Sequence, residues 1–257
     1  MVAGFLAKLA AKLIILVHKA KEGWLSSFGG PEFWLFAVVN IIVFILSLTV
    51  HEYAHARVAY LLGDDTAARR GRMSLNPVVH IDPVGTILMP LVGTLSNIPV
   101  IGWAKPVPVT PMRLTRRFSM RTGHALVAAA GPLSNLALAL LCTAMLWLLL
   151  STRLVPEFGA RVAVQALLSR LVLVNVGLAI FNLLPVPPLD GSRLLPRSLD
   201  GVMAVVERYS FLIFLGIIMF GRTIIAIPFQ IILALLGSLF GLDLWQIYRE
   251  SAMLVMH

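Results

Sequence analysis

Charge and cysteine are both scarce in this sequence. Charged residues make up 13% of the 257 positions, whereas 59% are hydrophobic and the mean hydropathy is +0.90. Soluble globular domains are only about 45–50% apolar, so these values exclude a soluble domain of any size and predict a polytopic membrane protein. The single cysteine, Cys142, excludes an internal disulfide and a cysteine-based zinc site.

Acidic residues are also few. Twelve Asp and Glu stand against 21 Lys and Arg, which gives a net charge of +9. Such a balance can indicate a nucleic-acid partner, but here the basic residues fall between apolar runs, as juxtamembrane charges do. We therefore expect a lipid bilayer and no nucleic acid as the partner of these charges.

The apolar runs predict an all-α polytopic membrane protein. We expect a three-helix core at about 33–62, 124–150 and 169–190, of the length that a bilayer requires. Residues 63–83 are polar and punctuated, which favours a hairpin or loop, and 84–101 are interrupted by proline and glycine, which favours a re-entrant or peripheral segment. A loop is expected at 151–168, and two short helices at 210–242.

Three regions follow from this organisation. Residues 1–30 are predicted to be an amphipathic N-terminal segment at the membrane interface, because apolar residues there are interspersed with lysines. Residues 31–200 form the predicted catalytic core, and residues 201–257 the C-terminal transmembrane helices and tail. The sequence does not decide whether residues 2–17 cross the membrane.

One motif inside the first run carries chemistry. His51, Glu52 and His55 form an H-E-x-x-H, and residues four apart on a helix share one face, so both imidazoles can bind one metal ion. A helix begun near Phe33 carries His51 roughly 27 Å along its axis, still inside a bilayer core of about 30 Å. A zinc ion held this way needs a third protein ligand and an open position for water.

Asp190 is the best candidate for that third ligand. It follows the third run in a segment with three prolines in four positions, which cannot stay helical, and a carboxylate at membrane depth is costly unless it is paired or coordinated. A simple turn with Gly191 is the alternative role for Asp190. His80 and Asp82 are a second candidate pair, although their punctuated loop favours a turn.

A shared site fixes the topology. If His55 and Asp190 bind one metal at the C-terminal ends of their helices, those helices run parallel and the 124–150 helix runs antiparallel between them. Residues 63–123 then begin and end on one side of the membrane, and the positive-inside rule makes that side cytoplasmic. The basic residues expected on that side are Arg69, Arg70, Arg72, Lys105, Arg113, Arg116, Arg117, Arg121, Arg193, Arg197 and Arg208, against Arg153 and Arg161 opposite.

These motifs together resemble the site-2 protease family of intramembrane zinc metalloproteases, in its compact prokaryotic branch. Two supporting runs are Gly131-Pro132-Leu133-Ser134-Asn135 and Asn182 through Gly191, which follow the H-E-x-x-H in the family's order. Further matches are Gly71-Arg72-Met73-Ser74-Leu75-Asn76-Pro77, His80-Ile81-Asp82-Pro83 and Trp103-Ala104-Lys105-Pro106-Val107. The PDZ and nucleotide-sensing modules of other branches are not seen.

The resemblance implies a role for each residue. His51, His55 and Asp190 would bind one Zn²⁺, and Glu52 would be the general base. Asn182, with Asn135 as a second candidate, would hold the substrate strand or polarise the scissile carbonyl. The segment 63–83 would be a membrane-entering hairpin that pairs with the substrate.

We therefore expect a zinc metalloendopeptidase that hydrolyses peptide bonds in or near transmembrane segments of membrane-protein substrates. The expected location is the prokaryotic inner membrane, with the active site toward the cytoplasm, and a homodimer is left open. One alternative is a non-catalytic zinc-binding membrane scaffold, which the intact Glu52 argues against. The other is a transporter, which the absence of a visible inverted repeat argues against.

Overall fold

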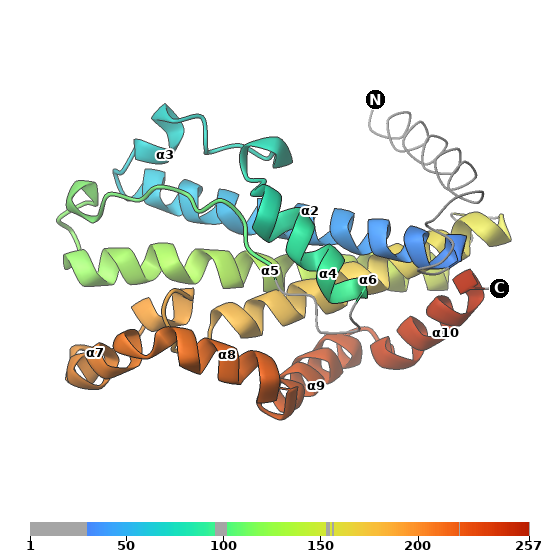
Figure 1. Cartoon of the computed structure of the whole chain (residues 1–257). Coiled ribbons are helices and arrows are strands. Elements are labelled where there is room, and N and C mark those ends of the chain that lie inside the picture. The colour runs from blue at the N-terminus through green and yellow to red at the C-terminus, as the bar shows by residue number, and fades with distance from the viewer. Residues whose placement is uncertain (1–29, 96–101, 153–154, 156, 221, 257) are drawn as a thin grey trace.

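The computed structural model describes residues 30–95, 102–152, 155, 157–220 and 222–256. Within these ranges the chain is helical and contains no strand (Figure 1). The predicted all-α polytopic class is confirmed. The predicted interfacial segment at the N-terminus lies, apart from Gly30, outside the described residues.

Three helices are long and apolar enough to cross a membrane. They are α2 (Pro31–Leu61), α5 (Met120–Ser151) and α6 (Phe158–Asn182). Helix α2 begins with a proline in its first turn, where no backbone N–H is needed. It is followed by Gly63 with φ of +100°, a conformation that favours glycine.

Helices α2 and α6 run in the same direction. The guanidinium of Arg170 on α6 donates to Asn40 Oδ1 on α2 at 2.5 Å. Further along both helices, the amide of Asn175 donates to Ser47 Oγ at 2.9 Å. Since the second contact lies further along both helices than the first, α2 and α6 are parallel, as a shared metal site requires.

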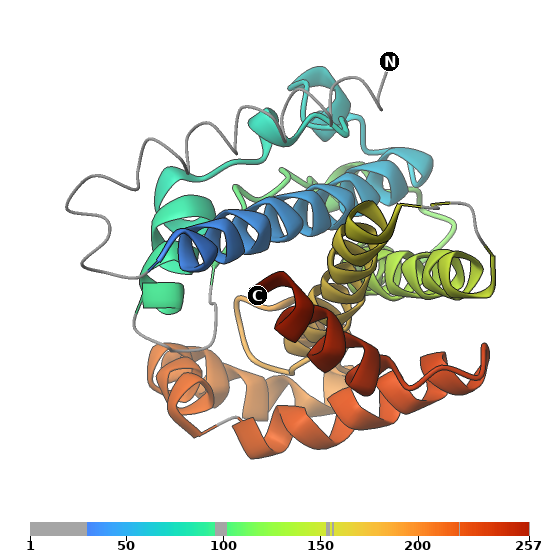
Figure 2. The same cartoon turned by 90° about the vertical axis from the view of Figure 1, so that its right-hand side faces the viewer.

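Helix α5 runs opposite to both (Figure 1). The Asn135 amide donates to the Ser47 carbonyl of α2 at 3.3 Å, whereas His55, two turns later on α2, contacts the carbonyl of Val127, two turns earlier on α5. Viewed after a quarter turn, α6 lies between α2 and the C-terminal helices (Figure 2).

The third helix begins earlier than the sequence predicts. It starts at Phe158, inside the predicted loop at 151–168, and it ends at Asn182, before Asp190. Arg161 lies in the part of α6 that was predicted to be loop, and it donates to the carbonyls of Leu149 and Leu150 on α5, while Arg170 donates to Asn40 on α2. Because these cations have partners within the bundle, the helix continues through them.

The segment between α2 and α5 leaves and returns at one end of the bundle. We call this segment, residues 62–119, the excursion. The Thr115 N–H donates to the Leu62 carbonyl at 2.5 Å, which joins the two ends of the excursion. Its described part holds α3 (Thr66–Arg69), η2 (Pro77–Val79), η3 (Pro83–Leu88), α4 (Met89–Leu95) and η4 (Pro111–Arg113), and no strand. Residues 63–83 are thus a loop with short helical turns and form no β-hairpin. Nearby side chains accept several of its backbone N–H groups, and its prolines have none to donate.

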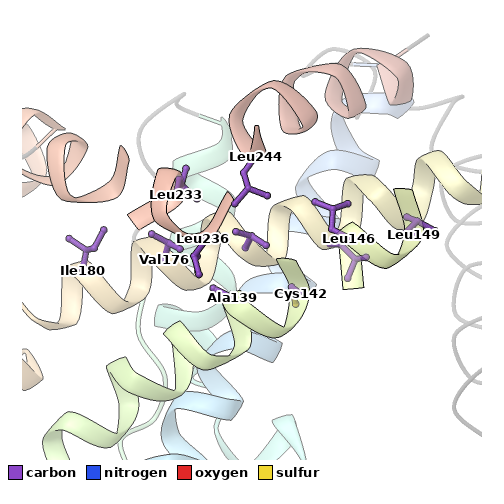
Figure 3. Close-up of a cluster of buried hydrophobic side chains, with 11 residues drawn as sticks. Ala139, Cys142, Leu146, Leu149, Val176, Ile180, Leu233, Leu236 and Leu244 are labelled. Carbon is purple, nitrogen blue, oxygen red and sulfur yellow. The ribbon is translucent and has the colours of Figure 1, made fainter. Parts of the chain in front are cut away.

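The C-terminal region adds helices to the core. These are η5 (Asp190–Arg193), η6 (Arg197–Leu199), α7 (Asp200–Arg208), α8 (Ser210–Phe220), α9 (Arg222–Ser238) and α10 (Leu244–Met256). The pair α8 and α9 matches the two short helices predicted for 210–242. Side chains of α9 and α10, including Leu233, Leu236 and Leu244, pack with α5 and α6 in one buried apolar cluster (Figure 3).

Candidate metal centre

His51 and His55 lie one turn apart on the inner face of α2. Both are buried, with exposed fractions of 3% and 8%. Their Nε2 atoms are 3.0 Å apart, so the two rings converge on one point. The regular helix alone produces this convergence, because residues four apart share a face.

Asp190 reaches the same point from the far end of α6. Its Oδ2 lies 3.2 Å from His51 Nε2 and 3.1 Å from His55 Nε2. After α6 ends, the chain folds back so tightly that a Cβ on Gly191 would lie 2.2 Å from the Leu183 carbonyl oxygen. The proline-rich turn and this glycine therefore present the carboxylate to the two histidines.

The three donor atoms fit a tetrahedral metal ion. A zinc ion with bonds of about 2.0–2.1 Å places its ligand atoms about 3.3–3.4 Å apart, close to the observed edges of 3.0, 3.1 and 3.2 Å. Two imidazoles and a carboxylate form the type of donor set that catalytic zinc sites use. Across the described ranges this is the one group of three or more such side chains that could hold a metal.

A chain of hydrogen bonds fixes which nitrogen of His51 faces the metal position. The Asn175 amide donates to the Leu171 carbonyl at 2.8 Å, which orients its Oδ1 toward the Asn135 amide at 2.7 Å. Asn135 then presents its own Oδ1 to His51 Nδ1 at 2.6 Å. Because that oxygen can only accept, Nδ1 carries the proton and the lone pair of Nε2 is free for a metal.

His55 is oriented in the same way by the backbone. Its Nδ1 lies 2.7 Å from the Val127 carbonyl oxygen on α5, an acceptor that requires a proton on Nδ1. Its Nε2 is therefore also a lone-pair donor. Helix α5 thus orients both imidazoles without supplying a ligand.

Gly131 leaves room for the metal position. A Cβ built on this residue would lie 2.4 Å from His55 Nε2 and 2.6 Å from His51 Nε2. Real Cβ atoms do not approach other atoms so closely, so α5 can pass the donor atoms only with a glycine here. The cradle is shaped for an ion and excludes a side chain.

Glu52 lies beside the two histidines and is half-buried. Its Oε2 accepts a hydrogen bond of 2.9 Å from the backbone N–H of Val107. The carboxylate is thus held against a segment that approaches α2 from the excursion. No pattern in the sequence indicates this partner, since Glu52 and Val107 are 55 positions apart.

The remaining predicted residues occupy different positions. Asn135 is buried in the network behind His51, whereas Asn182 donates to the carbonyl of Leu178 on its own helix at 2.9 Å. A substrate-binding role for either stays a prediction. His80 contacts the Ser74 carbonyl and Asp82 accepts the N–H groups of the η3 turn, so this pair stabilises its loop, away from the donor group.

Sequence reasoning missed Asn175 and Ser47. Asn175 is completely buried at the middle of α6 and joins three helices through its amide. An isolated amide within an apolar run signals that a polar partner is needed at membrane depth. That signal could have identified Asn175, although its partners could not be read from the sequence.

Comparison with known proteins agrees with this geometry. The family description "Peptidase family M50" matches residues 39–222. "Putative zinc metalloprotease YwhC" of Bacillus subtilis is 41% identical over 181 residues, covering 68% of this chain and 77% of that protein. "Putative zinc metalloprotease Rip2" of Mycobacterium tuberculosis is 32% identical over 180 residues, covering 65% of this chain and 64% of that protein.

The Rip2 protein of Mycolicibacterium smegmatis is 28% identical over 181 residues, and the match again spans 64% of that protein. No solved structure matches the chain significantly. The family match includes both histidines of the H-E-x-x-H as well as Asp190, and thus the whole donor group. The chain belongs to peptidase family M50, the site-2 protease family.

Proposed function

We propose that this protein is an intramembrane zinc metalloprotease that hydrolyses peptide bonds in or near transmembrane segments of other membrane proteins. The observation that carries the proposal is the buried donor triangle of His51, His55 and Asp190, with a carboxylate next to it, inside helices of membrane-spanning length. A purely structural metal site closes its coordination sphere with four protein ligands. Three ligands and a neighbouring carboxylate favour catalysis.

Three side chains would hold the metal. His51 and His55 through Nε2, with Asp190 through Oδ2, would hold one zinc ion, and the relatives' names and the donor set both support that metal. When bound, zinc polarises a scissile carbonyl and makes a water molecule acidic near neutral pH. The hydrogen bonds to Asn135 and the Val127 carbonyl place the proton of each neutral imidazole on Nδ1 and hold the rings in the orientation that presents Nε2 to the metal position.

Glu52 would move the proton. Its carboxylate accepts a proton from the attacking water, whose oxygen bonds to the scissile carbonyl carbon. The carboxylate then returns that proton to the leaving nitrogen as the C–N bond breaks, which yields a carboxylic acid and an amine. No oxidant or further reactant is needed.

The depth of the site determines the class of substrate. In a transmembrane helix each backbone carbonyl is already bonded within the helix, so the substrate must unwind locally before attack. The freed backbone groups then need partners, because hydrocarbon offers none. The excursion between α2 and α5 is non-helical over 102–110 and reaches Glu52, which supports its backbone as the partner of the unwound substrate.

The orientation of the chain in the membrane follows from where its arginines lie. The arginines around the excursion and the start of α5 lie at the end of the bundle where the excursion closes, and the positive-inside rule assigns this end to the cytoplasm. We propose an inner-membrane location with the metal centre nearer to the cytoplasmic face. A homodimer is not required, since one chain supplies the whole donor group.

A comparison of two membranes tests the proposal. Cells that express the wild-type chain or Glu52→Gln are compared by quantitative mass spectrometry for single-span proteins, and both purified chains are analysed for zinc. We expect one zinc per chain in both, and a single-span protein that accumulates only with Glu52→Gln. His55→Ala, which removes a ligand, should lose zinc as well as activity.

Two outcomes would contradict the proposal. Cleavage by Glu52→Gln at the wild-type rate would remove Glu52 from its role as base. A wild-type chain that holds zinc while no single-span protein differs between the two membranes would favour a non-catalytic scaffold.

A further inference from the structure

An extended segment runs along α2 beside the metal centre. Residues 102–110 adopt no helix or strand, and they include Pro106 and Pro108. Such a segment has no internal hydrogen bonds, so its path is set by the groups around it. Its contacts show that the path is fixed at nearly every second residue.

Three alternate backbone N–H groups of the segment have partners in the protein. The N–H of Trp103 donates to the Gly85 carbonyl at 3.1 Å, and that of Lys105 to the His80 carbonyl at 2.9 Å. Two residues later, the N–H of Val107 donates to Glu52 Oε2 at 2.9 Å. In an extended chain, groups two positions apart point the same way, so Val107 continues a regular row of donors.

Two buried side chains also bind the backbone of the segment, on either side of Val107 along the chain. Arg72, 9% exposed, donates from Nη2 to the carbonyls of Lys105 and Pro106. Further on, the Thr110 N–H donates to the buried Asp64 carboxylate at 2.6 Å. Val107 lies between these two anchors, so its N–H is placed before any substrate arrives.

We propose that the backbone N–H of Val107 is the positioning group for the general base Glu52. This inference rests on the proposed function. A glutamate has three side-chain torsions, and the hydrogen bond to Oε2 restricts them while the second carboxylate oxygen is left to take the proton. Fixing a reacting group in advance removes an entropic cost from the reaction step, and a misplacement of about 1 Å can cost about 100-fold in rate.

The position of Val107 permits a clean test. Val107→Pro deletes the N–H, and the residue before Pro108 is already restricted to the extended region in which the polyproline conformation lies. Val107→Ala is the matched control, since it removes most of the side chain and keeps the N–H. The amide-to-ester replacement at 107, made with the α-hydroxy analogue of valine, deletes the same donor with the side chain intact.

Each protein is purified and assayed in lipid vesicles with the single-span protein that accumulates in Glu52→Gln membranes. Val107→Ala, which keeps the N–H, measures the effect on kcat of losing the side chain alone. Both the proline and the ester variant should lose kcat by about 10–100-fold, with KM and one zinc per chain unchanged. A purely structural role for the segment would instead change KM, zinc content or folding.

Four results would overturn the inference. A kcat within twofold of the wild type for the ester variant, alongside an inactive Glu52→Gln, would show that Glu52 needs no help from Val107. A raised KM with unchanged kcat would assign the segment to substrate binding, and a raised kcat would make the contact inhibitory. A wild-type chain without cleavage would refute the proposed function itself, and the inference with it.

Discussion

Gly131 offers the sharpest test of the metal centre. Gly131→Ala adds a single methyl group on α5, and its Cβ would lie 2.4 Å from His55 Nε2, 2.5 Å from His51 Cε1 and 2.6 Å from His51 Nε2. Non-bonded heavy atoms attract at about 3.5–4.0 Å. The rings would therefore have to retreat by about 1 Å from the added methyl group.

That displacement is larger than coordination tolerates. Metal–ligand distances hold to within about 0.2 Å, and both imidazoles are fixed behind the site by Asn135 and the Val127 carbonyl. We expect Gly131→Ala to lower zinc affinity at least 100-fold, which corresponds to about 2.7 kcal/mol. Cleavage should be lost in parallel.

The assay is zinc content and zinc affinity of the purified chain, measured by mass spectrometry and by competition with a chelator. Gly177→Ala on α6 is the matched control, because the nearest heavy atom to its new Cβ is Phe229 Cε2 at an ordinary 3.8 Å. It should bind zinc as the wild type does. If Gly131→Ala also held one zinc at wild-type affinity, the assignment of this cradle to the metal would be refuted.

Three further predictions concern the surroundings of the site. Asn175→Leu should lower zinc affinity by about 10–100-fold in the same assay, because it breaks the chain of hydrogen bonds that orients His51; unchanged affinity would argue against that chain. Asn182→Ala should leave zinc binding unchanged, since its amide donates to the Leu178 carbonyl of its own helix, and a loss of zinc would contradict this. Arg121 holds the pKa of the Asp200 carboxyl below its ordinary value by a hydrogen bond. Arg121→Gln should raise that pKa, which carboxyl ¹³C NMR titration would show. Because the hydrogen bond favours the ionised carboxylate, its contribution to the stability of the fold is present above about pH 4 and is lost as the pH falls.

The sequence determined the parts of this protein that depend on local geometry. The pairing of His51 with His55 needs only a helix, whose period brings residues four apart onto one face. Three membrane-length helices follow from apolar length, and the break that presents Asp190 follows from prolines that cannot continue α6. The parallel course of α2 and α6 also followed, once both ends were required at one metal.

Only the tertiary structure decided the rest. The sequence places the start of α6 too late, at 169, because Arg161 looks unfavourable in a membrane helix and its acceptors on α5 are invisible in sequence. The hydrogen bonds that lead from Asn175 through Asn135 to His51 join residues 40 and 84 positions apart. The contact of Val107 with Glu52 joins residues 55 positions apart. A hydrogen bond requires two groups to meet within about 3 Å, and no period along the chain encodes which distant groups will do so.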